Sequence, residues 1–145
     1  MGSHKNPTIC DEENLRNLSN LIQNVQFQYG DYKKSMEYVT ENTFVYFDPP
    51  YRPLNTTSGF TSYTKEDFDD DNQRELAEFY RELNTQNVKL MLSNSNPKNT
   101  NKEDTFFDNI YQGFNIDEIY ASRMINANSK GRGKISEILV TNYNT

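Results

Sequence analysis

The sequence contains no tryptophan, a single cysteine and no long hydrophobic run. A lone cysteine, Cys10, excludes an internal disulfide and argues against a cysteine-based metal cluster. No apolar run approaches the ~18 residues of a membrane-spanning helix, and no charged start precedes an apolar stretch as in a secretory signal. These absences predict a soluble, cytoplasmic protein with no membrane partner and no metal.

Aromatic side chains are abundant, with ten tyrosines and nine phenylalanines among 145 residues. Disordered chains are poor in aromatic residues, and this length is typical of one folded domain. The formal charge of −6 argues against a protein that coats nucleic acid by charge alone.

The first half of the chain predicts alternating helices and strands. Residues 1–10 show no periodicity and are interpreted as a leader. Asp11 is typical of a helix N-cap, and the helically spaced apolar residues from Leu15 to Ile22 predict a stripe that faces the core. Residues 25–29 alternate apolar and glutamine side chains, which predicts a strand ending at Gly30.

The stretch at residues 43–47 contains five β-forming residues and predicts a strand that is buried on both faces. It follows a short helical stretch at residues 32–39. Two prolines end the predicted strand at residues 43–47, because proline cannot continue a central strand. Residues 52–68 have no period and predict a long loop.

The remaining elements continue the alternation of helices and strands. They are a helix carrying the apolar residues from Leu76 to Leu83, a strand at 88–92, a helix near 103–111, and a long-looped hairpin formed by 116–125 and 135–140. The sequence therefore predicts an α/β fold, with helices on both faces of a sheet and a carboxyl-terminal antiparallel hairpin. Ligands of such sheets bind at the carboxyl ends of strands.

The tetrapeptide Asp48, Pro49, Pro50 and Tyr51 stands at such an end and carries the clearest chemistry. The Asp48 carboxylate and the Pro49 carbonyl are two acceptors on a stiff backbone, and Tyr51 adds a flat aromatic face. Two acceptors beside a stacking plane fit a planar group bearing an NH₂, such as an unstacked adenine. A strand before a Pro-Pro turn is common, so the tetrapeptide alone is weak evidence.

A longer set of motifs carries a resemblance to a known family. The sequence resembles the D12-class DNA adenine N6-methyltransferases of the Dam type, in the family's order and over most of the chain after Lys5. The matching segments are residues 44–51 (FVYFDPPY), 53–54, 60–64, 92–95 (LSNS) and 132–143 (RGKISEILVTNY).

The resemblance implies a site-specific enzyme that uses S-adenosylmethionine to methylate a flipped adenine in double-stranded DNA, as in restriction–modification systems. Asp48 would be the catalytic acid group and would also lie near the cofactor. The Pro49 carbonyl would be its partner acceptor within the Pro49-Pro50 turn, and Tyr51 would stack on the base. Asp31 and Tyr32 would meet the cofactor's adenine.

Basic residues gather between residues 121 and 136. Lys130, Arg132 and Lys134 would form a phosphate-binding loop; a solubilised hairpin tip is an equally good interpretation. Ser93 and Asn94 are interpreted as closing a turn.

Full-length family members also have an amino-terminal half with a Gly-containing cofactor loop and most of the recognition domain. The resemblance therefore implies that residues 11–145 are the carboxyl-terminal part of an incomplete Rossmann-like methyltransferase domain. Residues 1–10 would be a tag or the end of the recognition region. We expect the isolated chain to be inactive and to need the missing half in trans; the alternative is a non-catalytic remnant that acts as a partner-binding module.

Overall fold

The structure, a computed structural model, describes residues 10–54, 68–122 and 134–144. Contacts divide the chain into two units, residues 1–32 and 33–145, which are described separately. The predicted boundary after residue 10 stays a prediction. Within the described residues, no helix is long and apolar enough to cross a bilayer.

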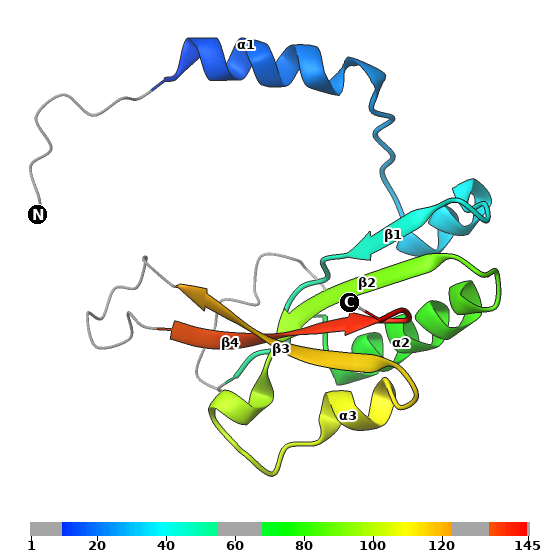
Figure 1. Cartoon of the computed structure of the whole chain (residues 1–145), viewed down its shortest axis with the longest axis vertical. Coiled ribbons are helices and arrows are strands. Elements are labelled where there is room, and N and C mark those ends of the chain that lie inside the picture. Colours follow the sequence, from blue (N-terminus) through cyan, green and yellow to red (C-terminus); the bar gives the residue numbers. More distant parts are fainter. Residues whose placement is uncertain (1–9, 55–67, 123–133, 145) are drawn as a thin grey trace, which may run out of the picture. The chain divides into compact units, whose positions relative to one another are not determined.

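The first unit contains the predicted amino-terminal helix, α1 (Glu12–Leu21), drawn in blue in Figure 1. Asp11 caps it, because its carboxylate accepts a hydrogen bond from the Asn14 N–H at 3.1 Å. Glu12 pairs with Arg16 one turn later at 2.6 Å, an exposed ion pair. A short 3₁₀ turn, η1 (Ile22–Asn24), follows.

Two expectations for this unit are wrong. Within this unit, the apolar stripe of α1 does not face a core: Leu15 and Leu18 are 54% and 49% exposed. Residues 25–29 form no strand, and Phe27 and Tyr29 are exposed. The physical reason is the same in both cases, since the described part of this unit contains no second element to cover a helix face or pair with a strand's backbone.

The second unit is built on a four-stranded mixed sheet in the order β1-β2-β4-β3. A 3₁₀ helix, η2 (Tyr32–Tyr38), leads into it. β1 (Phe44–Phe47) pairs in parallel with β2 (Lys89–Ser95), and β4 (Lys134–Thr141) pairs antiparallel with both β2 and β3 (Asn115–Ser122). The α/β class and the carboxyl-terminal antiparallel pair are confirmed.

Helix α2 (Asp70–Asn84) returns the chain from β1 to β2 (Figure 1). It begins with a capping box: the Asp69 carboxylate accepts from the Asn72 N–H, and the Asn72 side chain accepts from the Asp69 N–H. The residues that it buries recur at helical spacing: Gln73, Leu76, Ala77, Phe79, Tyr80 and Leu83. The predicted stripe is therefore confirmed as core.

Tyr80 lies at the centre of this core and is fully buried. Its ring packs edge-on against Tyr111 and Phe114, with centroids 5.5 and 4.9 Å away. Its hydroxyl shares its single proton between the carbonyl oxygens of Leu90 (3.1 Å) and Val140 (3.4 Å), on two neighbouring strands. One side chain thus ties α2 to the sheet through both apolar contact and hydrogen bonds.

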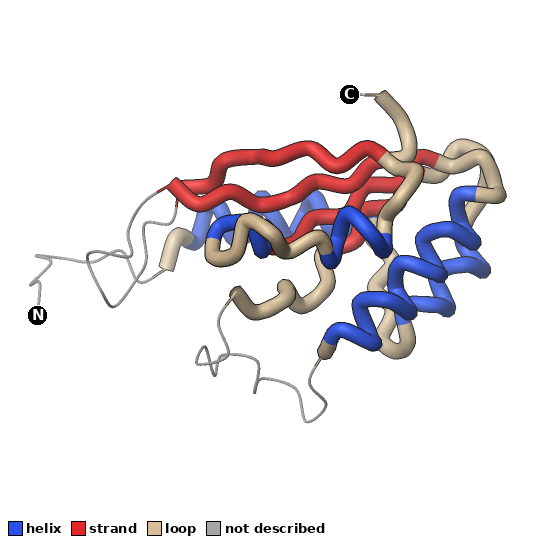
Figure 2. Tube along the Cα trace, turned by 90° about the horizontal axis from the view of Figure 1, so that it is seen from below, coloured by secondary structure: helices blue, strands red, loops and turns tan. Residues whose placement is uncertain are grey.

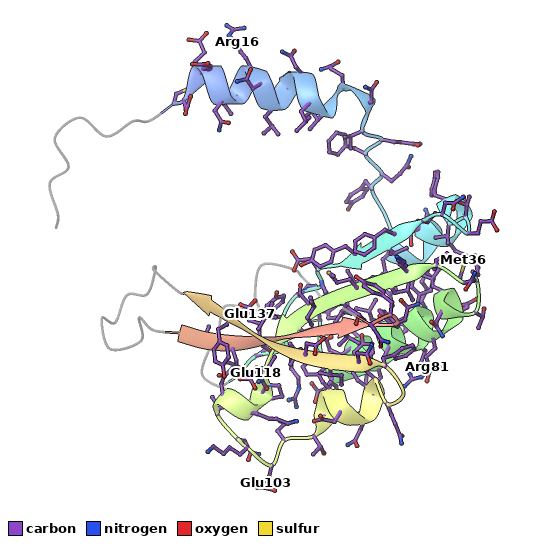
Figure 3. All side chains as sticks on the ribbon, in the orientation of Figure 1. Arg16, Met36, Arg81, Glu103, Glu118 and Glu137 are labelled. Atoms are coloured by element: carbon purple, nitrogen blue, oxygen red, sulfur yellow. The ribbon has the colours of Figure 1, made fainter. Side chains whose placement is uncertain are left out.

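Helix α3 (Phe106–Ile110) lies beside α2 on the same side of the sheet (Figures 1 and 2). The Arg81 guanidinium of α2, labelled in Figure 3, donates to the Ile110 carbonyl of α3. Phe107 and Ile110 of α3 are buried and join the core.

The opposite face of the sheet is less covered. Phe44 and Tyr46 are each 52% exposed, whereas Phe47 is buried against α2. The prediction that this strand is buried on both faces is therefore wrong for the described residues. β1 is at the end of the strand order, and both α2 and α3 pack on the other face of the sheet.

Candidate active site at the carboxyl ends of β1 and β2

The predicted tetrapeptide lies where the two parallel strands end together. Phe47, the last residue of β1, is in register with Leu92, so Asp48 follows β1 beside Ser93 of β2. Asp48 is exposed, and Tyr51 is half-buried. The Asp48 turn and the Ser93 segment therefore meet at one edge of the sheet.

A chain of hydroxyls reaches the Asp48 carboxylate. Ser93 Oγ donates to Asp48 Oδ1 at 3.3 Å, and Tyr46 Oη lies 2.8 Å from Ser93 Oγ. A serine hydroxyl has one hydrogen, so when Ser93 donates to Asp48 the proton between the two hydroxyls comes from Tyr46. The chain therefore fixes one carboxylate oxygen. Within the described residues, Asp48 Oδ2 receives no hydrogen bond.

Tyr51 stands beside a second carboxylate. Its hydroxyl donates to Glu137 Oε2 at 3.5 Å, a long contact; Glu137 is on β4 and is labelled in Figure 3. Burial raises the pKa of the Tyr51 phenol above its usual value; a hydrogen bond with Ser93 acts against this rise, and the carboxylates of Glu137 and Asp48 add to it. Tyr51 therefore remains a neutral aromatic ring at physiological pH.

Two buried amides hold the backbone around Tyr51. Gln73 Nε2 donates to the Pro50 carbonyl at 2.9 Å, and Asn94 Oδ1 accepts from the Arg52 N–H at 2.9 Å. Asn94 Nδ2 also donates to Gln73 Oε1 at 3.1 Å. Asn94 lies inside β2, so the prediction that it closes a turn is wrong: its side chain binds the neighbouring loop.

Arg52 anchors the next part of the loop. Its guanidinium binds Asp70 through two hydrogen bonds of 2.7 and 3.0 Å and Asp104 through one of 2.9 Å. It also lies over the Phe106 ring, 4.3 Å from the centroid. The hydrogen bond with Asp70 is the largest contribution raising the pKa of Arg52. The loop is thereby tied to the start of α2 and to the segment before α3.

Asp104 predicts a pH dependence of stability. Although burial raises its pKa, hydrogen bonds from Arg52 and the Phe106 N–H bring it below the usual 3.8. A lowered folded-state pKa stabilises the protein above the unfolded value, and this stabilisation is lost as the pH falls through the folded value. We expect Asp104→Asn to show a smaller loss of unfolding free energy between about pH 5 and about pH 3 than the parent chain.

Urea unfolding across this pH range measures the difference. Glu103→Gln, an exposed neighbouring change of the same charge, is the control. Equal acid sensitivity of Asp104→Asn and the parent would contradict the assignment.

The structure does not test the roles of the other predicted site residues. Asp31, which is exposed, and Tyr32, which is half-buried, close the first unit. Lys130 and Arg132 lie outside the described residues; Lys134 begins β4. Their roles stay predictions. Among the described residues, no group of three or more His, Cys, Asp or Glu could hold a metal ion.

Sequence reasoning missed Gln73, Arg52 and Tyr46. Gln73 had a signal, because it is a polar residue on the apolar stripe of α2, three positions before Leu76. Arg52 and Tyr46 had none, since their partners are distant in the sequence: Asp104 for Arg52 and Ser93 for Tyr46.

Comparison with known proteins identifies the family. The model of the D12 class of N6 adenine-specific DNA methyltransferases matches residues 1–125. Type II methyltransferase M.MjaIII of Methanocaldococcus jannaschii is 52% identical over 143 residues, which is 98% of this chain and 47% of that protein.

Two further relatives are also methyltransferases or methylases by name. A Type II methyltransferase of Lactococcus lactis is 41% identical over 98% of the chain and 48% of its own length. A DNA adenine methylase of Vibrio cholerae is 30% identical over 95% of the chain and 47% of its own length. The chain spans about half the length of these relatives, and it belongs to the D12 class of N6 adenine-specific DNA methyltransferases.

Proposed function

We propose that this chain carries the target-adenine site of a cytoplasmic DNA methyltransferase that transfers a methyl group from S-adenosylmethionine to the N6 amine of a flipped adenine. The observation that carries the proposal is the exposed Asp48 carboxylate. One of its oxygens is held by Ser93, and it stands beside the half-buried Tyr51.

The acceptors match an adenine amine. The amine has two N–H groups, and Asp48 Oδ2 and the Pro49 carbonyl are two acceptors that, within the described residues, receive no hydrogen bond. When both N–H groups are bound, the nitrogen lone pair points away from the acceptors. The Asp48 carboxylate also stabilises the positive charge that develops on the amine, a preorganised electrostatic contribution.

The ring of Tyr51 would hold the base by stacking. Aromatic stacking is worth about 1–3 kcal/mol per base and helps offset the cost of removing it from the duplex. The pKa of the Tyr51 phenol is raised, so the ring stays neutral at physiological pH and adds no negative charge of its own beside the DNA backbone.

The side chains of three predicted site residues suit the chemistry of the cofactor. S-adenosylmethionine, when bound, would supply an electrophilic methyl group on a positively charged sulfur. Asp48 has a carboxylate that suits this charge, and Asp31 and Tyr32 offer an acceptor and an aromatic ring for the cofactor's adenine. Basic residues near the β3–β4 connection, Lys130 to Lys134, would contact phosphates of double-stranded DNA.

A chimera tests the function. We would join this chain to the part of the M. jannaschii relative that it does not cover, and measure transfer of labelled methyl groups to DNA. We expect no transfer by the chain alone and transfer by the chimera, because the chain covers about half of such proteins.

A second candidate function is a non-catalytic partner-binding module. It is favoured by the exposed apolar residues of α1 and β1, such as Leu21 and Phe44. Failure of the chimera to methylate, while the intact M. jannaschii relative does so in the same assay, would favour this module over the enzyme.

Ser93 provides a finer prediction. Ser93→Ala removes the hydrogen bond to Asp48 Oδ1 and is expected to lower methyl transfer by the chimera about tenfold, the value of one hydrogen bond to a charged group. Ser35→Ala, a change on η2 away from this edge, is the control. Unchanged transfer by Ser93→Ala would show that Asp48 does not need this contact.

A further inference from the structure

The two peptide groups on either side of Tyr51 are each bound by a buried side chain. The Pro50 carbonyl before it accepts from Gln73, and the Arg52 N–H after it donates to Asn94, both at 2.9 Å. The two amides come from α2 and β2, elements that are separate from the loop. Tyr51 is therefore held by its neighbours in the chain, from two sides.

Burial and hydrogen bonds restrain the side-chain rotation of the two amides. Gln73 and Asn94 are both completely buried. Asn94 Oδ1 accepts from the Ser95 N–H as well as from Arg52, and its Nδ2 donates to Gln73 Oε1. A buried amide that loses its partners pays the full cost of desolvation, so rotating either side chain is costly. The pair forms a fixed bridge between helix, strand and loop.

The described residues beside Tyr51 are restrained as well. Prolines 49 and 50 have a fixed φ, and the Arg52 carbonyl accepts from Ser95 Oγ at 2.6 Å. The Arg52 side chain is held by Asp70 and Asp104. The two amides bind the peptide groups on either side of Tyr51 and so restrain its backbone.

We propose that Gln73 and Asn94 are positioning residues, which set the direction of the Tyr51 ring and of the neighbouring carbonyls toward the target base. The hydrogen bonds carry the claim that Tyr51 is held in place. The claim that it is held for a target base rests on the proposed function. A misplacement of about 1 Å in such a site can cost about 10²-fold in rate, which is why a rigid bridge at this position matters.

Amide hydrogen exchange of the unmodified chain tests the bridge directly. The Arg52 N–H is in a loop, yet we expect it to exchange about 10- to 100-fold more slowly than an unstructured amide, because breaking its bond costs the buried Asn94 Oδ1 one of its hydrogen bonds. Exchange at the unstructured rate would overturn the proposal. This measurement needs no variant, cofactor or DNA.

A single-tryptophan reporter tests the effect on residue 51. The chain has no tryptophan, so Tyr51→Trp introduces one fluorophore at the position of interest. In this background, Asn94→Asp removes the donor to Gln73 and keeps the acceptor for Arg52. We expect lower fluorescence anisotropy and severalfold faster iodide quenching of the tryptophan.

Asn96→Asp is the matched control. Asn96 is also buried, and its Nδ2 donates to Ser136 on β4 at 3.0 Å instead of supporting the loop. We expect the fluorophore to keep its parent anisotropy in this variant. An Asn94→Asp protein with parent anisotropy would overturn the proposal. If Asn94→Asp does not fold, the exchange rate of Arg52 in the unmodified chain decides.

These outcomes separate the two proposals. An inactive chimera together with a protected Arg52 amide overturns the enzymatic function and leaves the bridge in place. An active chimera with an unprotected Arg52 amide overturns the positioning role alone.

Discussion

Replacing Asp48 with alanine is expected to lower methyl transfer by the chimera by about 10²- to 10³-fold, the range for losing one preorganised electrostatic group in an active site. The change removes the only carboxylate of the tetrapeptide, and with it both the acceptor for the amine and the charge that stabilises it. Asp48→Asn keeps the shape and one acceptor oxygen, so comparing the two variants separates the contribution of charge from that of shape.

The fold is expected to survive this substitution. Asp48 is exposed, and substitutions at exposed positions change the free energy of unfolding by about 0.5 kcal/mol or less. Asp117→Ala, which removes an exposed carboxylate from β3, is the matched control and should retain full activity. If Asp48→Ala retained full activity too, the catalytic role of Asp48 would be refuted.

Tyr80→Ala is expected to reduce the free energy of unfolding by about 3–5 kcal/mol, the usual cost of truncating a large buried aromatic residue. Tyr80 is fully buried among Phe47, Tyr111 and Phe114, so its removal leaves a cavity between α2 and the sheet. For a domain of this size, such a loss is a large part of the total stability.

Urea unfolding of two further variants shows which contacts matter. Tyr80→Phe keeps the ring and loses only the hydroxyl that bonds Leu90 and Val140, so it should cost about 1–2 kcal/mol. Tyr120→Ala, at a tyrosine that is 71% exposed, should cost less than about 0.5 kcal/mol. A loss below about 1 kcal/mol for Tyr80→Ala would contradict the central place given to this residue.

Local signals predicted those elements that carry their own pattern. The helical spacing from Leu76 to Leu83 predicted α2, and the two apolar runs about a Gly-containing stretch predicted the pairing of β3 with β4. The prolines after Phe47 predicted where β1 ends. In each case, neighbouring residues in the sequence are enough to determine the local backbone conformation.

Predictions failed where burial depends on a distant partner. The α1 stripe and residues 25–29 have the patterns of a core helix and a strand, yet within their unit no described element covers or pairs with them. Periodicity shows which face is apolar and cannot show what lies against it.

The candidate site divides in the same way. Its chemistry was visible in Asp48 and Tyr51, because an acid and an aromatic ring around two prolines suit an amine-bearing base. The side chains that hold the site in place were not visible in the sequence, because Gln73, Asn94 and Arg52 act through partners on other elements. A polar residue on an apolar helix face, as at Gln73, is the one signal that could have indicated them.

The most direct test of the central claim is the identity of the methylated base. DNA treated with the chimera and S-adenosylmethionine is digested to nucleosides and analysed by mass spectrometry, with the intact M. jannaschii relative as the positive control. The site built on Asp48 and Tyr51 predicts N6-methyladenine from the chimera and none from its Asp48→Ala variant. N6-methyladenine at equal levels from both, or from the positive control alone, would contradict it.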